Sequence, residues 1–153
     1  MLFRSVLRVN EGKTGAFTVG ARSSNAVTLD VQGEFARRDS ATLVTLRSLQ
    51  LGADSSRWLL AGSADIRTAG RGVAIDSLVL LDNRGGRVEL SGAVPDTGRA
   101  RFVFRADSVS LRDVGVIAQL HTPLSGWANV TAAGAGTSLA PVVNMDEIGR
   151  AHV

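Results

Sequence analysis

The stretch IDSLVLLDNRGGRVELSGAV, residues 75–94, contains two runs of alternating apolar and polar residues on either side of DNRGG. Alternation with a period of two is typical of a β-strand with one apolar face. Gly supplies positive φ, and Asp and Asn side chains bond their own backbone, so DNRGG predicts a turn. The stretch therefore predicts an antiparallel hairpin that is apolar on one side only.

The same alternation continues in both directions along the chain. In two runs, ATLVTLRSLQL at 41–51 and VAIDSLVLL at 73–81, the apolar phase slips by one residue, which is the effect of a β-bulge. Strands of this kind, repeated along the chain, predict an all-β fold. The predicted apolar positions are Val27, Leu29, Val31 and Phe35; Val44, Leu46, Leu49 and Leu51; Trp58, Leu60, Ala64 and Ile66; Val73, Ile75, Leu78 and Leu80; Val88, Leu90 and Val94; and Phe102, Phe104 and Ala106.

Turn sequences separate these strands at short intervals, namely ADSS at 53–56, TAGRG at 68–72 and PDTG at 95–98. One helical turn is predicted, in LRDVGVIAQL at 111–120, although Gly115 weakens it. No second set of elements is available to cover the apolar face of the strands. Such a face must fold on itself, meet a partner or hold a ligand.

The composition excludes several classes of protein. The chain has 153 residues, enough for about one domain. It has no Cys, which excludes disulfides and thiolate metal sites, and no run of the ~20 apolar residues that a membrane-spanning helix needs. The net charge of +3 is too small to indicate nucleic acid. With no Tyr and 5% aromatic residues, the chain lacks the aromatic girdles of outer-membrane barrels.

No catalytic or metal-binding motif is present. His121 and His152 are the two histidines, and neither belongs to a triad or to a ligand pattern such as HExxH. The glycine-rich GAGTS at 134–138 lacks the lysine of a phosphate-binding loop, and the Asp spacing of calcium-binding β-rolls is missing. We therefore expect no enzyme activity, no cofactor and no metal.

The two ends resemble peptides encoded by sequencing adapters, LFRS near the N-terminus and EIGRAHV at the C-terminus. We expect residues 1–5 and 147–153 to be adapter scars and set them apart from the fold. The natural part is then expected to be an internal piece of a longer protein.

Four stretches in sequence order resemble the inner repeats of the TamB family, the translocation and assembly module proteins, and of their AsmA-like relatives. The likeness covers residues 57–146 and is weaker over 6–56. The matching stretches are RWLLAGSADI, IDSLVLLDNRGGRVELSGAV, FVFRADSVSLRDVGVIAQLHTPLSG and WANVTAAGAGTSLAPVV, the last closed by a G-T-x-x-x-P seam.

The resemblance implies part of an elongated, U-shaped repeating β-groove in the periplasm, within a protein anchored in the bacterial inner membrane. Such a groove carries phospholipid acyl chains toward the outer membrane and supports the assembly and secretion of outer-membrane proteins with a barrel partner. The expected lipid-facing residues are Leu60, Ile66, Val73, Ile75, Leu78, Leu80, Val88, Leu90, Phe102, Phe104 and Val130.

Two alternatives remain open from the sequence. The first is a structural or adhesive secreted β-solenoid whose own side chains fill its interior. The second is a scaffold that offers a sheet edge to unfolded outer-membrane strands. The solenoid predicts a dry, packed core and no bound lipid, whereas an experiment on competition between such a strand and lipid would test the scaffold.

Overall fold

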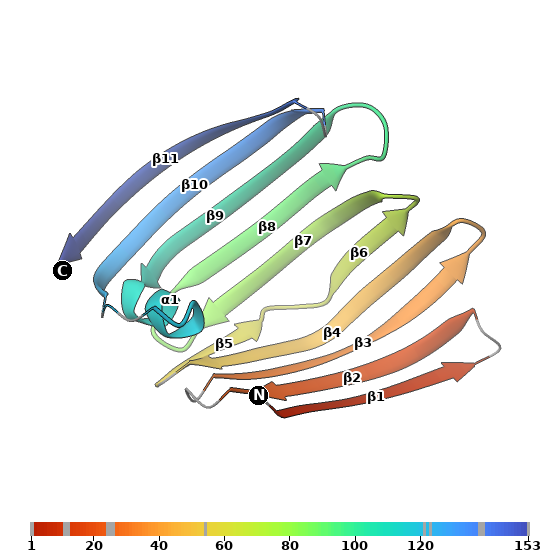
Figure 1. Ribbon diagram of the computed structural model, residues 1–153, viewed down its shortest axis with the longest axis horizontal. Helices are drawn as coiled ribbons and strands as arrows, with labels where there is room; N and C mark the ends of the chain where they lie inside the picture. Colours follow the sequence, from red (N-terminus) through yellow and green to blue (C-terminus); the bar gives the residue numbers. More distant parts are fainter. Residues whose placement is uncertain are drawn as a thin grey trace.

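The computed structural model describes residues 2–10, 13–23, 27–53, 55–120, 122, 124–137 and 140–152. The chain forms a single antiparallel sheet and one short helix (Figure 1). The all-β prediction is confirmed. The elements are β1 (Leu2–Asn10), β2 (Thr14–Arg22), β3 (Thr28–Arg38), β4 (Ala41–Ala53), β5 (Ser56–Leu60), β6 (Ala64–Ala69), β7 (Gly72–Asp82), β8 (Arg87–Val94), β9 (Ala100–Ser110), α1 (Leu111–Ile117), β10 (Ser125–Thr137) and β11 (Ala140–His152).

The strands follow one another across the sheet nearly in chain order. The path is β1-β2-β3-β4-β5-β7-β8-β9-β10-β11, and β6 lies beside it, paired with β4 and β7. Each hairpin therefore pairs with the next, as expected for consecutive one-faced strands joined by tight turns. The expected strand at 57–66 is in fact two strands, β5 and β6, because the chain leaves the ladder at residues 61–63.

The phase slips in the sequence coincide with register shifts. One lies between β3 and β4, where Arg47 is the extra residue, and one lies between β7 and β8 in the segment Ile75–Leu78. A third register shift, which the sequence analysis did not predict, lies between β9 and β10, where β9 has the extra residue and Ser108 has a φ of 50°. A bulge bends its strand and increases the local twist, so the three extra residues contribute to the curvature of the sheet.

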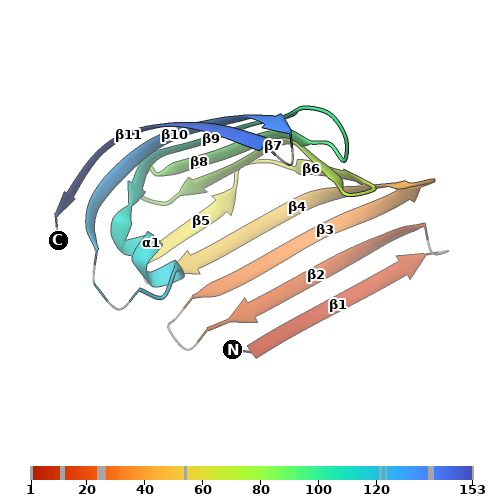
Figure 2. The ribbon, with the colours of Figure 1, turned by 45° about the horizontal axis from the view of Figure 1, so that its top comes forward.

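The sheet curves into an open half-pipe (Figure 2). Strands β8 to β11 arch over one side, and β1 to β4 extend along the other. The helix α1 lies at one end of the strands, where it contacts β9 and β10 and also β4 on the opposite arm. We call this end the helix edge. The opposite end, which carries the β3–β4, β6–β7 and β8–β9 connections, is the turn edge (Figure 1).

The strands at the two ends of the sheet include residues that we expect to be adapter scars. Strand β1 pairs with β2 from Leu2 to Asn10, and β11 pairs with β10 as far as His152. Pairing in the structure does not test the origin of these residues, so the adapter assignment stays a prediction. The boundaries expected at 6–56 and 57–146 also stay predictions.

Candidate functional site

The strand register places all eleven expected groove residues on one face of the sheet. Phe104 pairs with Leu90 of β8 and Ala132 of β10, and Leu90 pairs in turn with Leu78 of β7. Residues directly opposite each other on neighbouring strands point to the same side of a sheet. The other rows are Leu60–Leu80–Val88–Ala106–Val130, Ile66–Ile75–Gly92–Phe102–Gly134 and Val73–Val94.

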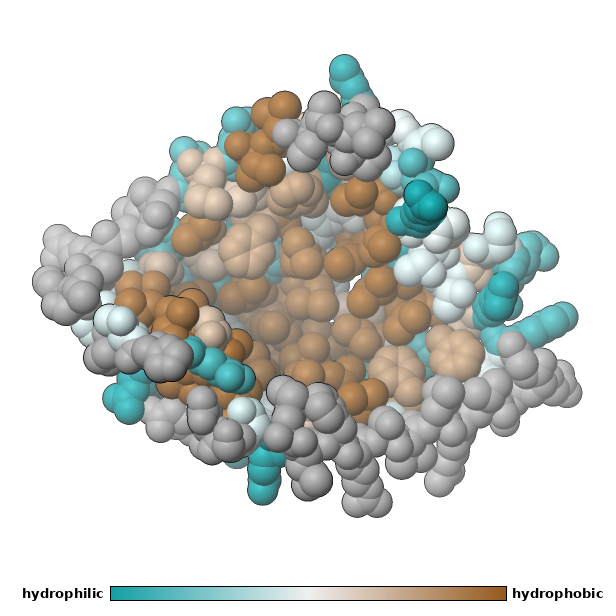
Figure 3. All heavy atoms as spheres, viewed as in Figure 1, coloured by the Kyte–Doolittle hydropathy of each residue, from teal (hydrophilic) through white to brown (hydrophobic). Residues whose placement is uncertain are grey.

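These rows line the concave side of the sheet, which we call the groove. Apolar side chains gather over the hollow in the space-filling view, and polar ones lie around its margin (Figure 3). On β2 to β10, the two ionisable residues in register with these rows are Arg37 at the turn edge and Asp82 at the helix edge. The floor of the groove therefore offers apolar contact and no charge.

The groove is not filled by its own side chains. None of the eleven expected residues is buried, ten being half-buried and Val73 being 41% exposed. The accessible surface of the chain is 10348 Å². A compact 16.0 kDa monomer is expected to expose about 7,400 Å², so this chain exposes roughly 40% more. The excess is what an uncovered apolar face produces.

Among the described residues, a small hydrophobic cluster lies at the helix edge. Trp58, Ala106 and Val109 are buried there. Four of the expected groove residues, together with Leu51, pack against this cluster: Leu80, Val88, Phe104 and Val130. Toward the turn edge the groove widens into half-exposed side chains. Packing therefore anchors one end of the sheet and leaves the remainder of the concave face open.

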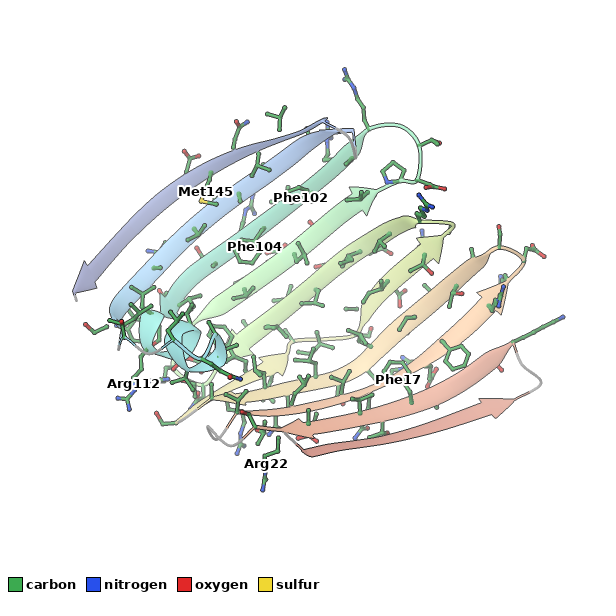
Figure 4. The ribbon with its side chains drawn as sticks, viewed as in Figure 1. Phe17, Arg22, Phe102, Phe104, Arg112 and Met145 are labelled. Atoms are coloured by element: carbon green, nitrogen blue, oxygen red, sulfur yellow. The ribbon has the colours of Figure 1, made fainter. Side chains whose placement is uncertain are left out.

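The ring of Phe102 lies flat over Gly134 on the neighbouring strand. A Cβ built on Gly134 would be 1.9 Å from a ring carbon of Phe102, so any larger residue would displace the ring. On the opposite arm, the ring of Phe17 covers Gly33 in the same way, with a ring carbon 2.6 Å from a built Cβ. Figure 4 shows the two rings on opposite arms of the sheet. Because each ring lies along the floor, neither closes the groove.

The helix α1 is held by a buried polar cluster that the sequence analysis did not anticipate. Asp113 is the largest side chain that is fully buried, and it accepts hydrogen bonds from Ser56 Oγ at 2.5 Å and from Arg84 Nη2 at 2.9 Å. Arg84 lies between two carboxylates, because its Nε is 3.7 Å from Asp82 Oδ2. These residues come from β5, the β7–β8 turn and α1, so the cluster joins the helix to the far side of the groove.

The sequence carries a weak signal for this cluster. That signal is Asp113 itself, the single acid in the mostly apolar helical turn LRDVGVI, which also contains Arg112. The alternation of a strand shows which face a residue occupies, and it cannot reveal that Asp82 and Asp113 meet around one arginine. Within the described residues, no group of three or more His, Cys, Asp or Glu residues is placed to hold a metal. His121 lies outside them.

The convex face carries the charges of the sheet. Arg47 pairs with Glu34 at 3.2 Å and Arg67 with Asp76 at 3.4 Å, and all four side chains are more than half exposed. On β9 this face carries Arg101, Val103, Arg105 and Asp107, with Arg105 opposite Glu89. Exposed pairs of this kind contribute little stability, so the convex face is a solvated surface.

Two further results concern membrane-spanning helices and similarity to known proteins. Within the described part of the chain, no helix has the length and apolar character needed to cross a membrane. A scan of protein-family models, a search of curated proteins and a search of solved structures each found no match to this chain.

Proposed function

We propose that this chain is part of an envelope-spanning TamB/AsmA-like protein of the periplasm, whose groove carries phospholipid acyl chains between the inner and outer membranes. One observation carries the proposal: the large apolar side chains of the concave face are half exposed, and no element of the described chain covers them. A contiguous exposed apolar surface marks a binding site. The order of the repeat-like motifs along residues 57–146 supports the family.

The binding free energy expected for an acyl chain allows the chain to move along the groove. Burial of apolar area is worth about 25 cal/mol per Å², or roughly 0.8 kcal/mol for each CH₂ of an acyl chain. The floor between Leu78 and Ala132 offers such contact without a hydrogen-bond donor or a charge that would fix the chain in one place. A chain in this groove is therefore bound by area alone, and it can slide without breaking specific contacts.

A photo-cross-linking experiment tests the groove. A photoreactive residue at Leu90 or Phe104 is expected to capture phospholipid during incubation with vesicles. The control carries the same residue at Val103, which lies on the convex face next to Phe104. Equal capture from both faces would contradict the proposal.

The two tryptophans provide an independent readout. Trp58 is 3% exposed and lies on the groove side at the helix edge, whereas Trp127 is 45% exposed and its neighbour Ala128 shares the groove face with Val130. Acyl chains carrying bromine quench tryptophan that they approach closely. We expect them to quench Trp58, measured in Trp127→Phe, more strongly than Trp127, measured in Trp58→Phe. The reverse order would place the lipid outside the groove.

A scaffold for outer-membrane strands is the second candidate. It requires a sheet edge that is free in the whole protein, and within this chain the outermost strands are β1 and β11. An exposed edge is a template for another strand. A peptide from an outer-membrane barrel strand would then bind this chain, and excess phospholipid would not displace it if the edge and the groove are separate sites. This candidate also accounts for the expected barrel-assembly partner.

A further inference from the structure

The two ends of the groove differ in what they offer to a bound amphiphile. The apolar rows run along the strands from Leu80, near the helix edge, to Val73, near the turn edge. Seven residue steps at about 3.3 Å each span roughly 20 Å. The hydrocarbon of one bilayer leaflet is about 15 Å thick, half of the bilayer core. An acyl chain that lies along the strands therefore fits the groove with its headgroup at one of the two ends.

The helix edge is closed to a headgroup. There α1 bridges β9 and β10 to β4, and the core around Trp58 fills the space beneath it. At this end Arg84 is already bound to Asp113 at 2.9 Å and lies near Asp82, and Arg57 is on the convex face beside Trp58. Arg22 and Arg112, at the same edge, point away from the sheet (Figure 4).

The turn edge is open and cationic. The apolar rows end there in Thr42 and Thr68, and Arg37 lies in register with Thr42 at the margin of the groove. The backbone N–H of Arg37 donates to the carbonyl of Lys13 at 2.6 Å, so the turns that carry these two cations are adjacent. The other exposed cations of the described turns are Arg38, Arg71 and Arg99, and the acids there are Asp39 and Asp96.

The β6–β7 and β8–β9 connections also meet at this edge. A Cβ built on Gly70 would be 3.0 Å from Asp96 Oδ2, and one built on Gly72 would be 2.9 Å from the Asp96 backbone N. Arg71 therefore lies beside the loop that carries Arg99. None of the five turn-edge cations forms an ion pair with a described carboxylate. Even with Glu11, which lies outside the described residues, cations outnumber acids by five to three.

We propose that the turn edge is the headgroup site of the groove, and that it selects anionic phospholipids over zwitterionic ones. The inference rests on the proposed function, because it requires acyl chains to occupy the groove. The chain ends point toward α1, and the phosphate and anionic headgroup lie against Arg37, Arg71 and their neighbours. Arginine forms bidentate hydrogen bonds with phosphate, and the excess of cations over acids at this end favours a headgroup with a net negative charge.

The test measures lipid extracted by the protein from vesicles of phosphatidylcholine and from vesicles of phosphatidylglycerol, quantified by mass spectrometry of the recovered protein. We expect the wild-type chain to take up phosphatidylglycerol preferentially. Arg37→Gln combined with Arg71→Gln is expected to lower that preference by about fivefold for each arginine, without lowering uptake of phosphatidylcholine. Lys13→Gln with Arg99→Gln is a second pair, which keeps the test decisive if the first pair does not fold.

The matched control, Arg22→Gln with Arg57→Gln, removes the same charge from the helix edge and is expected to keep the preference. An equal loss in both double variants, or no preference in the wild-type chain, overturns the headgroup site and leaves the groove intact. Extraction of neither lipid by the wild-type chain contradicts the groove as well. Flotation with phosphatidylglycerol vesicles without extracted lipid would show that the arginines contact a membrane surface instead, which also overturns the site.

Discussion

The contact between Phe102 and Gly134 leads to a double-mutant prediction. In Gly134→Ala, the new methyl group would fall within 1.9 to 2.6 Å of three ring carbons of Phe102. Gly134 has no positive φ, so the ring is the main obstacle. Overpacking of this kind costs about 1 to 3 kcal/mol of unfolding free energy, and the ring has to swing up into the groove.

Gly134→Ala is expected to have the opposite effect on the unfolding free energy when the ring of Phe102 is absent. Phe102 is half-buried, so Phe102→Ala alone costs about 1 to 2 kcal/mol, less than the loss of a fully buried ring. In that background, Gly134→Ala meets no ring and restricts the unfolded chain, which stabilises the protein by about 0.5 to 1 kcal/mol. The predicted coupling between the two sites is therefore about 1.5 to 4 kcal/mol.

Urea unfolding of the four proteins, followed by the fluorescence of Trp58, measures the coupling. Gly92→Ala is the control on the other flank of Phe102, because its φ is +137° and its built Cβ would be 2.3 Å from the backbone oxygen of Arg101. Removal of the Phe102 ring cannot relieve that contact. Additive effects at Gly134 and Phe102, or rescue of Gly92→Ala by Phe102→Ala, would refute the reasoning.

Three further predictions concern the helix edge and the convex face. Asp113→Asn should lower the unfolding free energy by about 1 to 3 kcal/mol and increase proteolysis within α1, because it weakens the hydrogen bonds from Arg84 and Ser56. Unchanged proteolysis would contradict the conclusion that this polar cluster holds α1 in place. Trp58→Ala should lower the unfolding free energy, measured with urea, by about 3 to 5 kcal/mol. Trp58→Phe should lower it much less, since Trp58 Nε1 donates no hydrogen bond. Equal losses in the two variants would contradict the conclusion that Trp58 stabilises the fold by apolar packing. Glu34→Gln should change stability by less than about 1 kcal/mol, because its pair with Arg47 is exposed, and a larger loss in the same assay would argue against a solvated face.

The local features of the fold could be predicted from the sequence because they depend on neighbouring residues. The alternation at Phe102 and Phe104, the slip between Ile75 and Leu78 and the turn after Asp82 are all observed. The helical turn expected at 111–120 is present as the seven-residue α1. Each of these features follows from side-chain period, phase or glycine content over a few residues.

The closure of the groove at one end could not be predicted in the same way. The contact of α1 with β4 joins segments more than fifty residues apart, as does the hydrogen bond between Ser56 and Asp113. Strand period reports which face a residue occupies and nothing about how far the sheet bends. The split of 57–66 into β5 and β6 could not be predicted either, because the apolar phase continues across it. Both strands pair with β4 and β7, and the ladder is interrupted at residues 61–63.

The three extra residues in β4, β7 and β9 imply that the bend of this sheet depends on residue number as well as on residue type. Loss of Ser48 would restore strict alternation from Leu46 to Leu49 without exposing either leucine, yet it would remove one of the bends. Such a deletion of one codon would leave the pattern of apolar residues unchanged, yet it would flatten the arm formed by β1 to β4 and widen the groove. Lineages that tune the width of such a trough can therefore do so by adding or removing one residue in a strand, while every apolar side chain keeps its place.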